Sequence, residues 1–199
     1  MRGNIASGNK TMEYRLLWTK MLITATNFKL YNYINLKGDF IPQQSQPQQI
    51  ENNKAAFIKA SVTHITKIIT EIESGNDEIK TSLKCKAYFI YACLLKNDFV
   101  ESYEQDFGID KNVPSAIKYF NKVLDLNRRD PRVLYKMGEI YEYDISDEDM
   151  SNMVHANGGI DEVTNAIDKA IEYYTNSAQY GYERAEAKLA KFGITIESI

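Results

Sequence analysis

The sequence predicts an all-α protein built from stacked pairs of antiparallel helices, and three observations lead to this prediction. Apolar residues recur at helical spacing along most of the 199 residues, and no alternating run is long enough to indicate a strand. The chain has only four prolines and ten glycines, which argues against a turn-dense β-sandwich. Two helix pairs in the second half of the chain also share a pattern of residues, which is typical of a repeat architecture.

The first quarter of the chain predicts a helical segment followed by a polar connection. Residues 1–11 are small and polar, so we expect a frayed, disordered N-terminus. A helical segment over 12–41 follows, in which the helix runs to Leu36 and Gly38 can end it. The stretch 42–50 is rich in glutamine and proline, and it therefore predicts a linker or an exposed loop.

Residues 51–199 are expected to form one domain of helices. Their starts are marked by capping residues or by proline in the first turn, and several of their ends are marked by glycine. An acidic loop at 144–160 interrupts the series; a solvated loop is its simplest interpretation, and binding of a cation or of a basic partner is the alternative. The predicted helices cover 51–73, 78–96, 113–127, 131–143, 161–180 and 183–192.

Two of these helix pairs carry the same pattern of small and aromatic residues. The first helix of one pair reads Ala-Ile-Lys-Tyr-Phe at 116–120, and that of the other reads Ala-Ile-Glu-Tyr-Tyr at 170–174. The second helices match at three positions each: Val133, Met137 and Gly138 against Ala185, Leu189 and Ala190. Small residues let two helices approach and aromatic rings fill the layer between pairs, so stacked pairs would share a continuous core.

At these residues the chain resembles the Sel1-like repeat family, which is related to the tetratricopeptide repeats. The clearest copy covers 169–193, and the resemblance extends over 75–193. The resemblance implies a short α-solenoid and an adaptor or scaffold role. The chain departs from the family pattern at Asn127, where glycine is usual, and at the inserted acidic loop. An irregular helical bundle with alanine and tyrosine in its core is the alternative fold.

The leading function is that of a non-enzymatic adaptor that binds a protein partner in the groove of the repeats. By the shared register, eight residues on the first helices of the two pairs should line this partner-binding surface: Lys118, Asn121, Lys122, Asp125, Glu172, Thr175, Asn176 and Gln179. Fungal members of the family include activators of chitin synthase, so a regulatory subunit of such a membrane enzyme is the alternative within this class.

Composition and motifs favour this class over an enzyme or a nucleic-acid-binding protein. The net charge of −3 provides no broad basic field for DNA, RNA or an anionic membrane. Two histidines and two cysteines are too few for most metal sites. We therefore assign no catalytic, cofactor-binding or metal-binding residue, and a helical enzyme that uses His64 or a buried carboxylate is the remaining alternative.

The sequence also predicts a cytoplasmic protein. We find no segment long and apolar enough to insert into a membrane or to act as a secretory signal. Cys85 and Cys93 lie eight residues apart on one predicted helix, too far apart to form a disulfide. Both are expected to be small buried residues in a reducing compartment.

Overall fold

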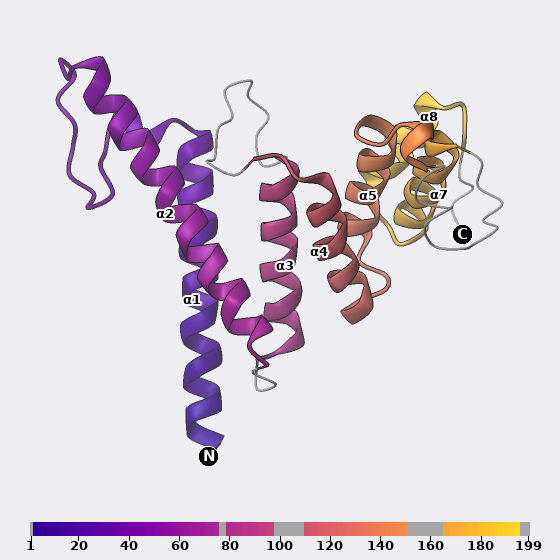
Figure 1. The fold of residues 1–199 in the computed structure, drawn as a ribbon, viewed down its shortest axis with the longest axis horizontal. Coiled ribbons are helices and arrows are strands. Elements are labelled where there is room, and N and C mark those ends of the chain that lie inside the picture. The colour runs from indigo at the N-terminus through magenta and orange to yellow at the C-terminus, as the bar shows by residue number, and fades with distance from the viewer. Residues whose placement is uncertain (1, 76–78, 98–109, 151–164, 196–199) are drawn as a thin grey trace. The chain divides into compact units, whose positions relative to one another are not determined.

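The computed structural model describes residues 2–75, 79–97, 110–150 and 165–195, and the regular structure in these ranges is helical (Figure 1). An isolated antiparallel β-bridge also joins Ile34 and Phe40. The prediction of an all-α protein is therefore confirmed. The helices are α1 (Arg2–Asn27), η1 (Leu30–Asn32), α2 (Pro47–Glu73), α3 (Thr81–Lys96), α4 (Val113–Leu126), α5 (Pro131–Tyr143), α7 (Ala166–Gln179) and α8 (Glu183–Lys191).

The N-terminal helices begin and end at other residues than the sequence predicted. The helical backbone of α1 begins at Arg2, before the predicted start at residue 12, and it stops at Asn27 instead of Leu36. Lys29 adopts a left-handed conformation with φ of 54°, after which η1 makes one short turn. Helix α2 begins at Pro47 because proline is suited to the first helical position, so the predicted linker is shortened to the residues before it.

The acidic segment at 144–160 is described as far as Met150, and its prediction as a loop is wrong for the last four of these residues. Residues 147–150 are helical. The Asp149 amide donates to Ser146 Oγ (3.1 Å), and the Ser146 amide donates to Asp149 Oδ2 (3.0 Å), which forms a capping box. The rest of the segment, with His155, lies outside the described residues.

The chain divides into two compact units, Met1–Tyr119 and Phe120–Ile199. In the first unit α1 packs along α2, and α2 also contacts α3 and η1. Leu22, Tyr31 and Phe57 form a buried cluster where α1, η1 and α2 meet. Because α1 packs on α2 across the polar connection, the division between the units does not fall at the predicted linker.

In the second unit α7 packs against both α5 and α8. Its core contains five buried residues of α7 and α8: Ala170, Tyr174, Ala178, Ala185 and Leu189. Gly138 of α5 lies against the ring of Tyr174, where an added Cβ would be only 2.6 Å from Tyr174 Cε1. A small residue is thus needed at this position for α5 and α7 to approach. The stacking of helix pairs into a solenoid stays a prediction.

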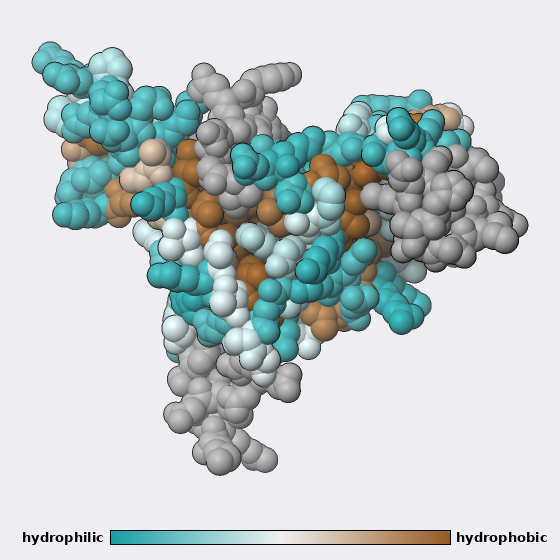
Figure 2. Space-filling model, viewed as in Figure 1, coloured by the Kyte–Doolittle hydropathy of each residue, from teal (hydrophilic) through white to brown (hydrophobic). Residues whose placement is uncertain are grey.

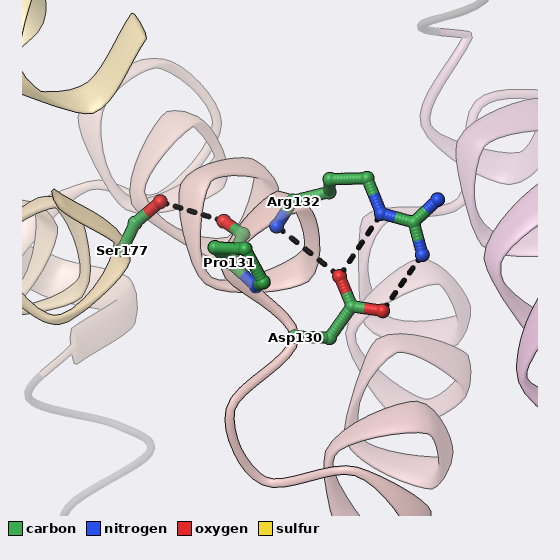
Figure 3. Close-up of polar contacts among 4 residues, drawn as sticks. All are labelled: Asp130, Pro131, Arg132 and Ser177. Carbon is green, nitrogen blue, oxygen red and sulfur yellow. Dashed lines mark hydrogen bonds and ion pairs between the residues drawn. The ribbon is translucent and has the colours of Figure 1, made fainter. Parts of the chain in front are cut away.

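The start of α5 is fixed by the predicted aspartate–proline pair, as Figure 3 shows. Asp130 is 4% exposed and accepts hydrogen bonds from the Arg132 amide (3.2 Å) and from Arg132 Nη2 (2.8 Å). The Ser177 hydroxyl of α7 donates to the Pro131 carbonyl (2.6 Å). The cap and this hydrogen bond together fix the first turn of α5 against α7.

Candidate functional site

The eight residues predicted to bind a partner lie on α4 and α7, and they differ in exposure. Five are exposed and three, Lys122, Thr175 and Asn176, are half-buried. Glu172 pairs with Lys169 of its own helix at 2.7 Å. Lys118 belongs to the first unit and the other seven belong to the second. The packing that dominates the second unit joins α7 to α5 and α8, so a single surface formed by all eight residues stays a prediction.

A concave apolar feature lies in the first unit, where α1, α2 and the segment between them meet. A cavity of about 550 Å³ opens there, and we call it the α1 groove. Leu22 and Phe57, each 3% exposed, are among its most buried lining residues. Its other large apolar lining residues are Leu17, Trp18, Met21, Leu30, Ile34 and Leu36. Figure 2 shows apolar side chains among hydrophilic ones at the left of the view.

Helix α1 creates one wall of the groove because it is apolar on two sides. Its inner side is buried in the first unit and includes Met12, Leu16, Leu22 and Ile23. The outer side carries four large residues that are 43–60% exposed: Tyr14, Leu17, Trp18 and Met21. These four are spaced as one stripe along a helix, and we call them the outer stripe. An exposed apolar surface of this kind is typical of an interaction site.

The opposite wall is the segment between α1 and α2, and hydrogen bonds hold its backbone in place. The Asn53 side chain of α2 donates to the carbonyls of Tyr31 (2.6 Å) and Ile34 (2.7 Å). Asn35 Oδ1 accepts from the amides of Lys37 (2.8 Å) and Asp39 (3.0 Å), which closes a tight turn. This wall is therefore shaped before any ligand arrives.

The two charged residues that line the groove are both basic, and Asp39 beside them accepts from the Asn35 side chain (3.0 Å). Lys20 and Lys37 are exposed, and no acidic residue accompanies them in the lining. The structure gives neither lysine an ion pair within the described part of the chain. The surrounding stretch 10–40 contains five basic residues and two acidic ones. The groove thus joins an apolar floor to a positively charged rim.

A second cluster of ionisable side chains lies where α5, α7 and α8 of the second unit meet. The Tyr174 hydroxyl donates to Glu142 Oε2 (2.6 Å), and Lys188 Nζ donates to Glu142 Oε1 (2.7 Å). The side chains of Glu142 and Lys188 are each 12% exposed. Lys188 also contacts the Tyr143 hydroxyl. Residues of α5, α7 and α8 thus meet in one polar cluster.

The environment of this cluster keeps each group in its ordinary charge state. Burial raises the pKa of the Tyr174 hydroxyl, and the bond to Glu142 raises it further. Burial alone would raise the pKa of Glu142, but hydrogen bonds from Lys188, Tyr174 and Tyr143 lower it overall. Burial alone would lower the pKa of Lys188, but its bonds to Glu142 and Tyr143 raise it overall. The cluster therefore stabilises packing and is poorly suited to moving a proton.

The described ranges contain neither a metal-binding cluster nor a membrane-spanning helix. Within 2–75, 79–97, 110–150 and 165–195, we find no group of three or more His, Cys, Asp or Glu side chains arranged to hold a metal ion. In those same ranges, no helix combines the length and apolar character needed to cross a bilayer. Cys85 is half-buried and Cys93 is buried, and neither forms a disulfide within the described residues.

Helical periodicity over 12–36 did not reveal the α1 groove, because it does not show which apolar residues stay exposed. The available signal was that α1 has too many large apolar residues for one face, since Leu16 and Leu17 are adjacent and cannot point the same way. Neither the known protein-family models nor the curated proteins and solved structures yield a match to this chain. The resemblance to Sel1-like repeats thus rests on the sequence pattern alone.

Proposed function

We propose that this chain is a non-enzymatic adaptor that binds a protein partner through the α1 groove. The observation that supports this proposal most directly is the outer stripe of α1 beside a preformed apolar cavity. The inner side of α1 already supplies its packing on α2, so the outer stripe is not needed for the fold. Large apolar residues that are exposed without a structural role are typical of an interface.

The dimensions and composition of this surface favour a protein over a small molecule. The outer stripe runs from Tyr14 to Met21, which is about 10 Å of helix. Tyr14 does not line the cavity, so the apolar surface extends beyond the cavity itself. Trp and Tyr side chains are frequent among residues that dominate the affinity of protein interfaces. A ligand confined to the cavity would leave part of this surface uncovered.

The proposal is tested by capture of partners from a lysate of the source cells on the immobilised chain. The double substitution Leu17→Asp and Met21→Asp should remove a protein that the unchanged chain retains. The matched control is Ile167→Asp, because Ile167 is 40% exposed on α7, outside the groove. A protein that the control loses and the groove variant retains would contradict the proposal. Circular-dichroism melting of all three chains checks that folding is preserved.

The predicted surface on α4 and α7 is a separate expectation for the same adaptor function. Changing Lys122 and Asn176 together to glutamate should weaken partner capture and leave the helicity and the melting temperature nearly unchanged. Both side chains are half-buried, so the melt is needed to separate a binding effect from a folding effect. Full recovery of the partner on this double variant would exclude the surface.

A further inference from the structure

Starting from the proposed function, we further propose that the partner presents an acidic amphipathic α-helix, which lies along α1 and fills the α1 groove. Two properties of the groove lead to this choice of occupant: the arrangement of its apolar side chains and the sign of its charges. The proposal identifies the class of partner, whereas the adaptor function alone does not.

The apolar side chains of the groove fit the side of a helix. The outer stripe presents residues at positions i, i+3, i+4 and i+7 of α1, a spacing that matches the ridges of a second helix packed against it. Leu22 and Phe57 lie deeper in a cavity of about 550 Å³, which is large enough for several aliphatic side chains. Since Asn53 and Asn35 fix the opposite wall, a helix can enter without reshaping the groove.

The charged side chains of the groove call for carboxylates on the partner. Lys20 lies on α1 among the outer-stripe residues, and Lys37 lies on the opposite wall, so cations flank the apolar lining. Neither lysine has an ion pair in the described ranges, so both are available to acidic side chains of the partner. Opposite charges at the rim speed association and select among partners of similar apolar character.

The same observations disfavour a second copy of this chain and a lipid bilayer. In a symmetric dimer the same surface faces itself, so Lys20 and Lys37 of two copies would be brought together and would repel each other. A bilayer surface is nearly flat on this scale, so it would leave the deeper residues Leu22 and Phe57 unreached. An individual helix has side chains that project far enough to contact them.

The proposal can be tested with designed peptides, because Trp18 lines the groove and is the single tryptophan of the chain. Two tryptophan-free helical peptides of about 15 residues carry the same leucines at i, i+3, i+4 and i+7. One has glutamates beside the leucines and the other has lysines. Each is titrated into the full chain while Trp18 emission is followed. We expect the acidic peptide to shift the emission to the blue and to bind at least about tenfold more tightly, with the difference shrinking at high salt.

Charge reversal in the chain assigns the preference to the groove. The double substitution Lys20→Glu and Lys37→Glu should invert the preference for the two peptides. The control changes Lys59 and Lys67 to glutamate, since both are exposed on α2 and do not line the groove; it should retain the preference for the acidic peptide. Equal affinities for the two peptides would overturn the proposal and leave the adaptor function standing, whereas absence of any Trp18 response to either peptide would contradict both.

Two further measurements test whether a lipid bilayer or a second copy of the chain occupies the groove instead. In the first, vesicles of phosphatidylcholine and phosphatidylserine are added to the chain. A larger shift of Trp18 emission with vesicles than with the acidic peptide would overturn the proposal in favour of a membrane surface. Sedimentation that shows a dimer, lost when Leu17 is changed to aspartate, would overturn it in favour of a second copy. A monomer whose Trp18 emission responds to the acidic peptide and not to vesicles supports the proposal.

Discussion

At the scale of single residues, the contact between α5 and α7 depends on the lack of a side chain at Gly138. The ring of Tyr174 is fully buried and occupies the space where a Cβ of residue 138 would lie. We predict that Gly138→Ala lowers the free energy of unfolding by about 1–3 kcal/mol through overpacking, even though alanine favours a helix by about 1 kcal/mol. Urea denaturation measures this change. With Tyr174→Leu already in place, adding Gly138→Ala should cost less, and an equal cost would show that the ring is not the cause.

The polar cluster around Glu142 predicts a dependence of stability on pH. The pKa of Glu142 is lowered by folding, so its contribution is present in full above its ordinary pKa of 4.5 and is lost as the pH falls below that value. Lys188→Met removes the cation and leaves a largely buried carboxylate. We predict a loss of about 1–3 kcal/mol near neutral pH, which shrinks as the pH falls because a proton on Glu142 removes the unpaired charge.

Urea denaturation at several pH values tests this second prediction. Lys169→Met is the control, because the side chain of its partner Glu172 is 47% exposed and the pair should contribute less than about 1 kcal/mol. Equal losses for the two variants would mean that burial of the Glu142–Lys188 pair has no special effect on stability. A second substitution, Glu142→Gln, should restore part of the stability lost in Lys188→Met, since it removes the unpaired charge.

At the scale of elements, the two sides of α1 differ in what they stabilise, and adjacent leucines allow a direct comparison. Leu16 is 4% exposed and Leu17 is 54% exposed. We predict that Leu16→Ala lowers the free energy of unfolding by about 2–5 kcal/mol and that Leu17→Ala changes it by less than about 0.5 kcal/mol. Urea denaturation of both variants measures the difference. A large loss for Leu17→Ala would give the outer stripe a role in the fold and weaken its assignment as a binding surface.

The helices and the groove also show which structural features the sequence can predict. Helices were predictable because their periodicity and caps are local: Asp130 and Pro131 mark the start of α5 in the sequence and in the structure. The α1 groove was not predictable in this way. Which stripe of α1 packs on α2 is decided by tertiary contacts, and one wall of the groove depends on a hydrogen bond from Asn53 to Tyr31, 22 residues earlier. No local pattern encodes such a contact.

At the scale of the whole molecule, charge is distributed unequally between the two units. Residues 1–119 contain 15 basic and 12 acidic side chains, whereas residues 120–199 contain 9 and 15. The net charge of −3 is therefore the sum of a positive charge on the first unit and a larger negative charge on the second. An acidic partner is attracted to the unit that carries the α1 groove, so its association should weaken as salt is added.

The division into two units also predicts how the whole chain unfolds. Trp18 is the single tryptophan and lies in the first unit, so its fluorescence follows that unit alone, whereas far-ultraviolet circular dichroism follows the helices of both. If each unit is stabilised by its own core, Leu16→Ala should lower the urea midpoint measured by Trp18 fluorescence. Gly138→Ala should leave that fluorescence midpoint unchanged and should shift part of the circular-dichroism transition to lower urea concentration. Equal shifts of both signals by both variants would show that the units unfold as one, because a change in either core would then destabilise the whole chain.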